Sequence, residues 1–159
     1  MSGKFTFRRE DTGERSRIVL EGVIDEDALL EKAFTDLKPG VDVDLRGILR
    51  INSCGIRSWV NLIGSISEDH DVIFQGCAPV IVRQLNMISN FGGRGKVQSF
   101  MLPYYCARCD KEQDIEVDTD AFLAKHPDCS APGQACASCN GQLEFDDIEE
   151  KYFHFLRQR

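Results

Sequence analysis

The sequence predicts an α/β protein: a mixed sheet with helices packed largely on one face, followed by a small cysteine-based module. Strand and helix patterns alternate along residues 4–102, and two Cys-x-x-Cys motifs follow in the last third of the chain. The 159 residues are 42% hydrophobic and 28% charged, an ordinary globular composition that excludes wholesale disorder. This length allows one medium domain or two small ones.

Two strands and a helix open the predicted domain. Phenylalanines alternate with polar residues at 4–8, which indicates an edge strand, and a turn then leads to a strand at 17–24 that is rich in β-branched residues. A helix is expected from Asp25 onward, because acidic side chains favour the positive end of a helix and apolar residues recur at helical spacing. The Pro-Gly pair at 39–40 ends this helix.

The next elements alternate in type. Residues 41–45 form a short alternating strand, and a second helix begins near Cys54, with Trp59 among its inward-facing apolar residues. A strand at 71–75 follows and ends at a glycine.

A third helix is expected at 79–89, and a last strand at 97–102. The glycine-rich segment at 92–96 between them lacks the setting of a phosphate-binding loop and is interpreted as a mobile turn. This order of elements predicts a mixed sheet.

The segment from Val43 to Trp59, Val-Asp-Leu-Arg-Gly-Ile-Leu-Arg-Ile-Asn-Ser-Cys-Gly-Ile-Arg-Ser-Trp, resembles the signature of the STAS domain, the family of the anti-sigma factor antagonists. The likeness is most specific at 52–55 and, with the order of elements, extends over about residues 4–102. It implies a STAS-like domain at 1–103 that acts by protein–protein interaction in signalling.

In that family a serine just before the glycine, at the head of the second helix, accepts a regulatory phosphate, and Cys54 occupies its place here. Asn52 also replaces the common aspartate. Because a cysteine does not accept phosphate from an ordinary serine kinase, the neighbouring Ser53 is the candidate phosphosite. The resemblance implies a partner surface made of Asn52, Ser53, Cys54, Gly55, Arg57 and Ser58.

Two of these residues have simpler interpretations. Ser53 could cap the helix by accepting a bond from a free backbone N–H, with no regulatory role. Cys54 could be a small core residue, or a redox sensor whose thiol is activated by the helix dipole.

Four cysteines, Cys106, Cys109, Cys136 and Cys139, form two Cys-x-x-Cys knuckles. Two such knuckles complete a tetrahedral shell for Zn²⁺, and four filled positions leave no open site for catalysis. The sequence therefore predicts a zinc ribbon at 104–159 with a structural zinc ion. His126 and Cys129 lie between the knuckles and could each substitute for a ligand, while four unrelated cysteines or a redox pair are the remaining alternatives.

Charge separates the two parts of the chain. The formal net charge is −7, and residues 104–159 hold six Lys and Arg against twelve Asp and Glu, or −6. Such a tail repels phosphate backbones and anionic membrane surfaces. A nucleic-acid-binding zinc ribbon is therefore disfavoured.

These features predict a non-catalytic regulatory protein of bacterial-type signalling, soluble and cytoplasmic, with no export signal and no membrane segment. The expected partner is a protein, such as a kinase or an anti-sigma-like regulator. A homodimer is the alternative assembly. The sequence shows no nucleophile paired with a base, no carboxylate pair and no open metal site, so an enzyme is not expected. The alternative is a STAS module that senses a small molecule or nucleotide. The aromatic run at 152–156 is expected to pack the ribbon against the first domain or a partner.

Overall fold

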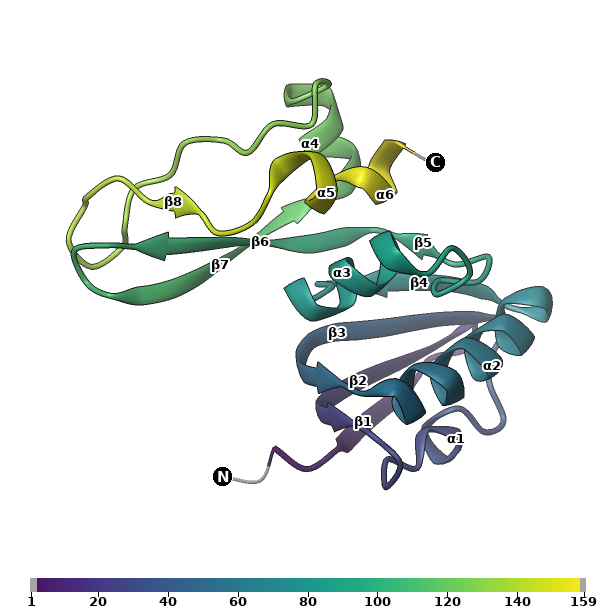
Figure 1. Ribbon diagram of the computed structural model, residues 1–159. Coiled ribbons are helices and arrows are strands. Elements are labelled where there is room, and N and C mark those ends of the chain that lie inside the picture. Colours follow the sequence, from purple (N-terminus) through teal and green to yellow (C-terminus); the bar gives the residue numbers. More distant parts are fainter. Residues whose placement is uncertain (1–2, 158–159) are drawn as a thin grey trace.

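Residues 3–157 are described by the computed structural model, and they form two sheets that share one core (Figure 1). The larger sheet has five strands in the order β1-β2-β3-β4-β5. Only β1 and β2 pair antiparallel, so the sheet is mixed, as predicted. The strands are β1 (Thr6–Asp11), β2 (Arg15–Ile24), β3 (Gly40–Ile51), β4 (Asp71–Gln75) and β5 (Lys96–Val97).

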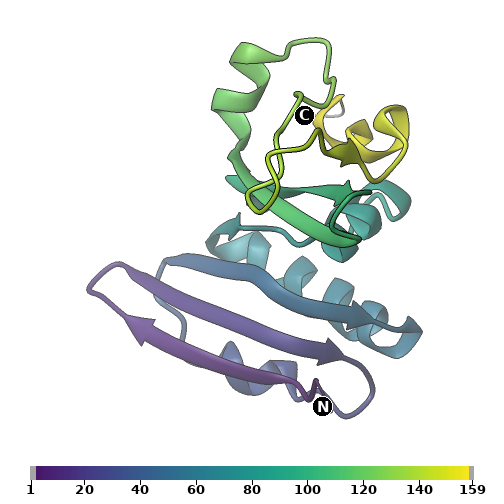
Figure 2. The same cartoon turned by 90° about the vertical axis from the view of Figure 1, so that its left-hand side faces the viewer.

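The helices of this part cover one face of the sheet. They are α1 (Leu30–Ala33), α2 (Ser53–Asp69) and α3 (Pro79–Met87). In Figure 2 strands β1 to β3 face the viewer and the helices lie behind them. Strand β2 shows why the helices pack on this face. Its side chains alternate between buried positions on the helix side and more exposed positions on the open side. No helix within residues 3–157 is long and apolar enough to cross a membrane.

A smaller antiparallel sheet, in the order β7-β6-β8, carries the rest of the chain. Its strands are β6 (Ser99–Cys106), β7 (Lys111–Asp118) and β8 (Glu144–Phe145), and its helices are α4 (Thr119–Lys125), α5 (Glu149–Tyr152) and α6 (His154–Arg157). Side chains on one face of β6 pack under these helices, with Phe100 in edge contact with Phe122, Phe153 and Phe155.

The first predicted helix is shorter than expected. Residues 25–29 form turns instead, because the Asp25 carboxylate accepts a bond from the Asp27 backbone N–H at 2.9 Å and its carbonyl accepts one from Ala28 at 3.1 Å. Only the single turn α1 is helical. The helical spacing predicted Leu29 and Ala33 on the inner face; Ala33 is buried, but Leu29 is exposed and Leu30 fills the core instead.

The last predicted strand, at 97–102, is divided between the two sheets. Strand β5 ends at Val97, and β6 begins at Ser99 and continues without a break through Pro103 to Cys106. The sequence-based boundary between 103 and 104 therefore falls inside β6.

Polar contacts also join the two sheets. On the open face of the larger sheet the buried Asp44 pairs with Arg17 at 3.2 Å and with Arg46 at 2.9 Å. Arg46 also reaches Glu116 of β7 at 2.7 Å.

The C-terminal aromatic run packs against α3, as predicted. The Asn86 amide donates to the Tyr152 carbonyl at 2.9 Å and accepts from the Phe155 backbone N–H at 2.8 Å. Trp59 is also a core residue, fully buried, with its indole N–H bonded to the Phe91 carbonyl at 2.9 Å. These contacts fix the smaller sheet and its cysteines on the larger one.

Candidate functional site

The first knuckle closes the β6–β7 hairpin. Cys106 ends β6 and Cys109 lies in the turn that follows. The turn closes at Asp110, whose backbone N–H donates to the Cys106 carbonyl at 2.8 Å and whose φ is 54°. Aspartate and asparagine tolerate this left-handed conformation better than most residues, so the local sequence suits the turn.

The second knuckle repeats this construction in the loop that leads to β8. Asn140 donates its backbone N–H to the Cys136 carbonyl at 2.9 Å and has a φ of 59°. An isolated bridge between Ala135 and Gln142 closes the base of the loop. Each Cys-x-x-Cys motif is therefore followed by the Asp or Asn that its tight turn requires.

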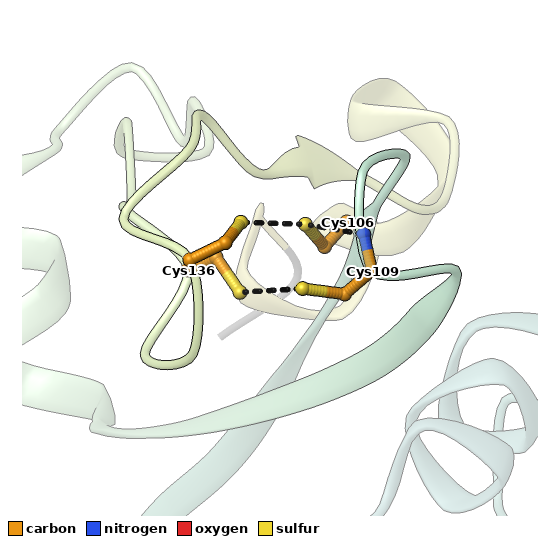
Figure 3. A group of neighbouring side chains, drawn as sticks. Cys106, Cys109 and Cys136 are labelled. Carbon is orange, nitrogen blue, oxygen red and sulfur yellow. Dashed lines mark hydrogen bonds between the residues drawn. The ribbon is translucent and has the colours of Figure 1, made fainter.

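The two knuckles bring their four sulfurs together. All four Sγ atoms lie within 4.8 Å of one another, with Cys106 and Cys139 3.5 Å apart and Cys109 and Cys136 3.8 Å apart. Figure 3 shows Cys106 and Cys109 pointing across the gap toward the second knuckle. A tetrahedral site with metal–sulfur bonds of 2.3 Å has sulfur–sulfur edges of about 3.8 Å. The four-cysteine cluster, as we call this group, could therefore hold a metal ion.

Hydrogen bonds give the thiols of the cluster unequal acidity. Backbone N–H groups of Cys139 and Ser138, together with the Gln113 amide, lower the pKa of Cys136 to about 6. A hydrogen bond with Cys139, followed by desolvation, raises the pKa of Cys109 to about 12. The Cys109 thiol therefore stays protonated near neutral pH by itself, whereas a bound divalent cation would stabilise its thiolate.

The two intervening residues that could have served as ligands lie elsewhere. His126 is the C-cap that follows α4, and its ring centroid lies 5.1 Å from that of Phe122. Cys129 is buried, and neither residue belongs to the four-cysteine cluster.

The head of α2 is the second candidate site, and Asn52 is its cap. The Asn52 side-chain oxygen accepts the Gly55 backbone N–H at 2.9 Å, while its amide donates to Glu26 at 2.8 Å. The interpretation of Ser53 as the cap is therefore wrong. The cap needs a side chain one residue before the first helical turn, and that residue is Asn52.

The candidate partner surface divides by exposure. Asn52, Ser53, Cys54 and Arg57 are exposed, whereas Ser58 is half-buried. Cys54 is thus not the small core residue of the simpler interpretation. The sequence pattern placed it near apolar residues, but in the first helical turn its side chain faces solvent.

Gly55 is buried because the head of α2 sits directly on the end of β2. A Cβ at this position would lie 2.1 Å from the Ile24 carbonyl oxygen, too close for any side chain. The same carbonyl accepts the Asn52 backbone N–H at 3.1 Å. The glycine of the motif is thus explained by close approach of two backbones.

Sequence reasoning missed two features near these sites. The Gln113 amide lies 3.0 Å from Cys136 Sγ, and no local pattern marks a contact between residues 23 positions apart. The buried Asp44 was missed as well, although alternating charges in its strand gave a signal.

No family model, curated protein or solved structure matches this chain.

Proposed function

We propose that this chain is a non-catalytic signalling protein that acts by presenting the head of α2 to a protein partner. The observation on which this rests is an exposed helix start that is held by hydrogen bonds and a close backbone contact. Asn52 is hydrogen-bonded to Gly55 and Glu26, and Gly55 packs against the Ile24 backbone. The exposed side chains of Ser53, Cys54 and Arg57 therefore start from a fixed backbone. A defined, exposed surface lowers the ordering cost of binding.

The same site supports kinship with STAS domains. The motif at 52–55 stands at the carboxyl end of β3 and begins α2, in a mixed sheet with helices on one face. By this analogy the partner is a kinase or an anti-sigma-like regulator, and phosphorylation of the exposed Ser53 would release it by adding charge. The analogy is one of motif and architecture, so function has to be tested at the site itself.

We also infer that the four-cysteine cluster holds a structural Zn²⁺. Four thiolates at tetrahedral spacing match the ligand set of structural zinc sites and leave no position for water or substrate. Reduced thiols suit a cytoplasmic protein. The ion would tie the loop of the second knuckle to the β6–β7 hairpin, and thus stabilise the smaller sheet.

Metal analysis of protein purified under reducing conditions tests the zinc assignment. We expect one equivalent of zinc in the wild type and in Cys54→Ser, and little in Cys136→Ser, because only the last substitution removes a ligand. Less than half an equivalent in the wild type would contradict the assignment.

Affinity capture from the source cell tests the interaction surface. We expect one protein to be captured by the wild type and lost with Arg57→Glu or Ser53→Asp. Lys125→Glu is the matched control, because it reverses an exposed charge on α4 instead. Equal capture by Arg57→Glu and the wild type would exclude the head of α2 as the binding surface.

A further inference from the structure

Gln113 connects the two knuckles of the four-cysteine cluster. It lies in β7 opposite Tyr104 of β6, so it shares a sheet face with Cys106 two residues further along β6. Its side-chain Nε2 is 3.0 Å from Cys136 Sγ. A residue of the first hairpin therefore reaches a cysteine of the second knuckle, 23 positions away in the chain.

This contact differs from the other donors around the sulfurs. Backbone N–H groups of Cys109, Ser138 and Gly141 each lie 3.4 Å from a cysteine sulfur of their own knuckle. Within residues 3–157, the Gln113 amide is the side-chain N–H donor that reaches the cluster, and its distance is the shortest of these contacts. Unlike these backbone donors, it reaches from the first hairpin to the second knuckle, as the sulfur–sulfur contacts also do.

We propose that Gln113 is a positioning residue of the metal site, an outer-sphere partner that holds Cys136 in place and raises the affinity for the ion. An N–H bond to a thiolate stabilises its charge, and groups of this kind orient the ligands of protein metal sites. Because the bond joins the two knuckles, it also holds the second loop near the hairpin before an ion binds, which lowers the ordering cost of binding.

The proposal rests on the zinc site proposed above and is tested by metal affinity. Zinc dissociation constants of the full chain would be measured by competition with a chelator at one fixed pH. Gln113→Leu should bind zinc about tenfold more weakly than the wild type. Gln113→Glu keeps the size of the side chain but places a carboxylate beside the thiolates, so it should lose more zinc affinity than Gln113→Leu. Gln142→Leu is the matched control, because Gln142 lies in the second-knuckle loop and its amide donates to the Leu143 carbonyl instead of a sulfur.

Cobalt substitution adds a readout that a general loss of stability does not change. Removing an N–H donor from a thiolate raises the energy of its sulfur electrons, so the sulfur-to-cobalt absorption of Gln113→Leu should move to longer wavelength. The ligand-field bands, which report four tetrahedral thiolates, should stay in place.

The proposal is overturned if Gln113→Leu binds zinc as tightly as the wild type, if it loses no more affinity than Gln142→Leu, or if its charge-transfer band does not move. Failure of the wild type to bind either metal would instead refute the zinc site itself. The two failures are therefore distinguishable.

Discussion

Replacing Gly55 with alanine should destabilise the protein, although alanine is the better helix former. The added Cβ would lie 2.1 Å from the Ile24 carbonyl oxygen and 2.7 Å from the carbonyl carbon, which are backbone atoms that cannot rotate away. The head of α2 would have to retreat by about 1.3 Å to bring this 2.1 Å approach to the 3.4 Å at which ordinary contact begins. That retreat would also stretch the 3.1 Å bond from the Asn52 N–H to the same carbonyl.

The magnitude follows from three contributions. Overpacking costs about 1–3 kcal/mol, and the weakened backbone hydrogen bond costs about 1 kcal/mol. The higher helix propensity of alanine offsets about 1 kcal/mol. We therefore expect a net loss of about 2 kcal/mol in the free energy of unfolding, or about 4–8 °C in Tm for a chain of this size.

Gly64 provides the matched control in the same helix. A Cβ built there has no heavy atom within 4 Å. Gly64→Ala should therefore stabilise the protein by about 0.5–1 kcal/mol, since only the propensity changes. Both free energies would be measured by urea unfolding followed by circular dichroism. If Gly55→Ala is as stable as the wild type, or both variants shift in the same direction, the close contact of α2 with β2 is not what excludes a side chain.

Three further predictions follow from burial and hydrogen bonding. Asn52→Ala should cost about 1 kcal/mol in thermal unfolding because it removes the helix cap, whereas Ser53→Ala should stay within about 0.5 kcal/mol; the reverse order would refute the cap assignment. Mass spectrometry after brief maleimide treatment should find the exposed Cys54 modified and Cys77 intact, because full burial raises the pKa of the Cys77 thiol; early labelling of Cys77 would contradict its burial. Burial raises the pKa of Tyr104 to about 12, so its neutral phenol is favoured in the folded state. The contribution of Tyr104 to the free energy of unfolding should be fully present below about pH 10 and should be lost as the pH rises from about 10 to about 12. Urea midpoints that stay constant over this pH range would contradict the prediction.

Local patterns determined most of the secondary structure and all four members of the cysteine cluster. Alternation of apolar residues predicts β2, helical spacing predicts α2 and α3, and each Cys-x-x-Cys motif sets its own turn. These features depend on neighbours within a few residues, so their information lies in the local sequence.

Other features depended on contacts between distant segments. The division of the strand after Val97 between two sheets follows from which strand each half pairs with, and single-sequence patterns do not contain that choice. The same holds for the burial of Gly55 on Ile24 and for the amide of Gln113 at Cys136. Sequence periodicity reports which side of an element is apolar, whereas the identity of the atoms that meet there is decided only when the elements pack.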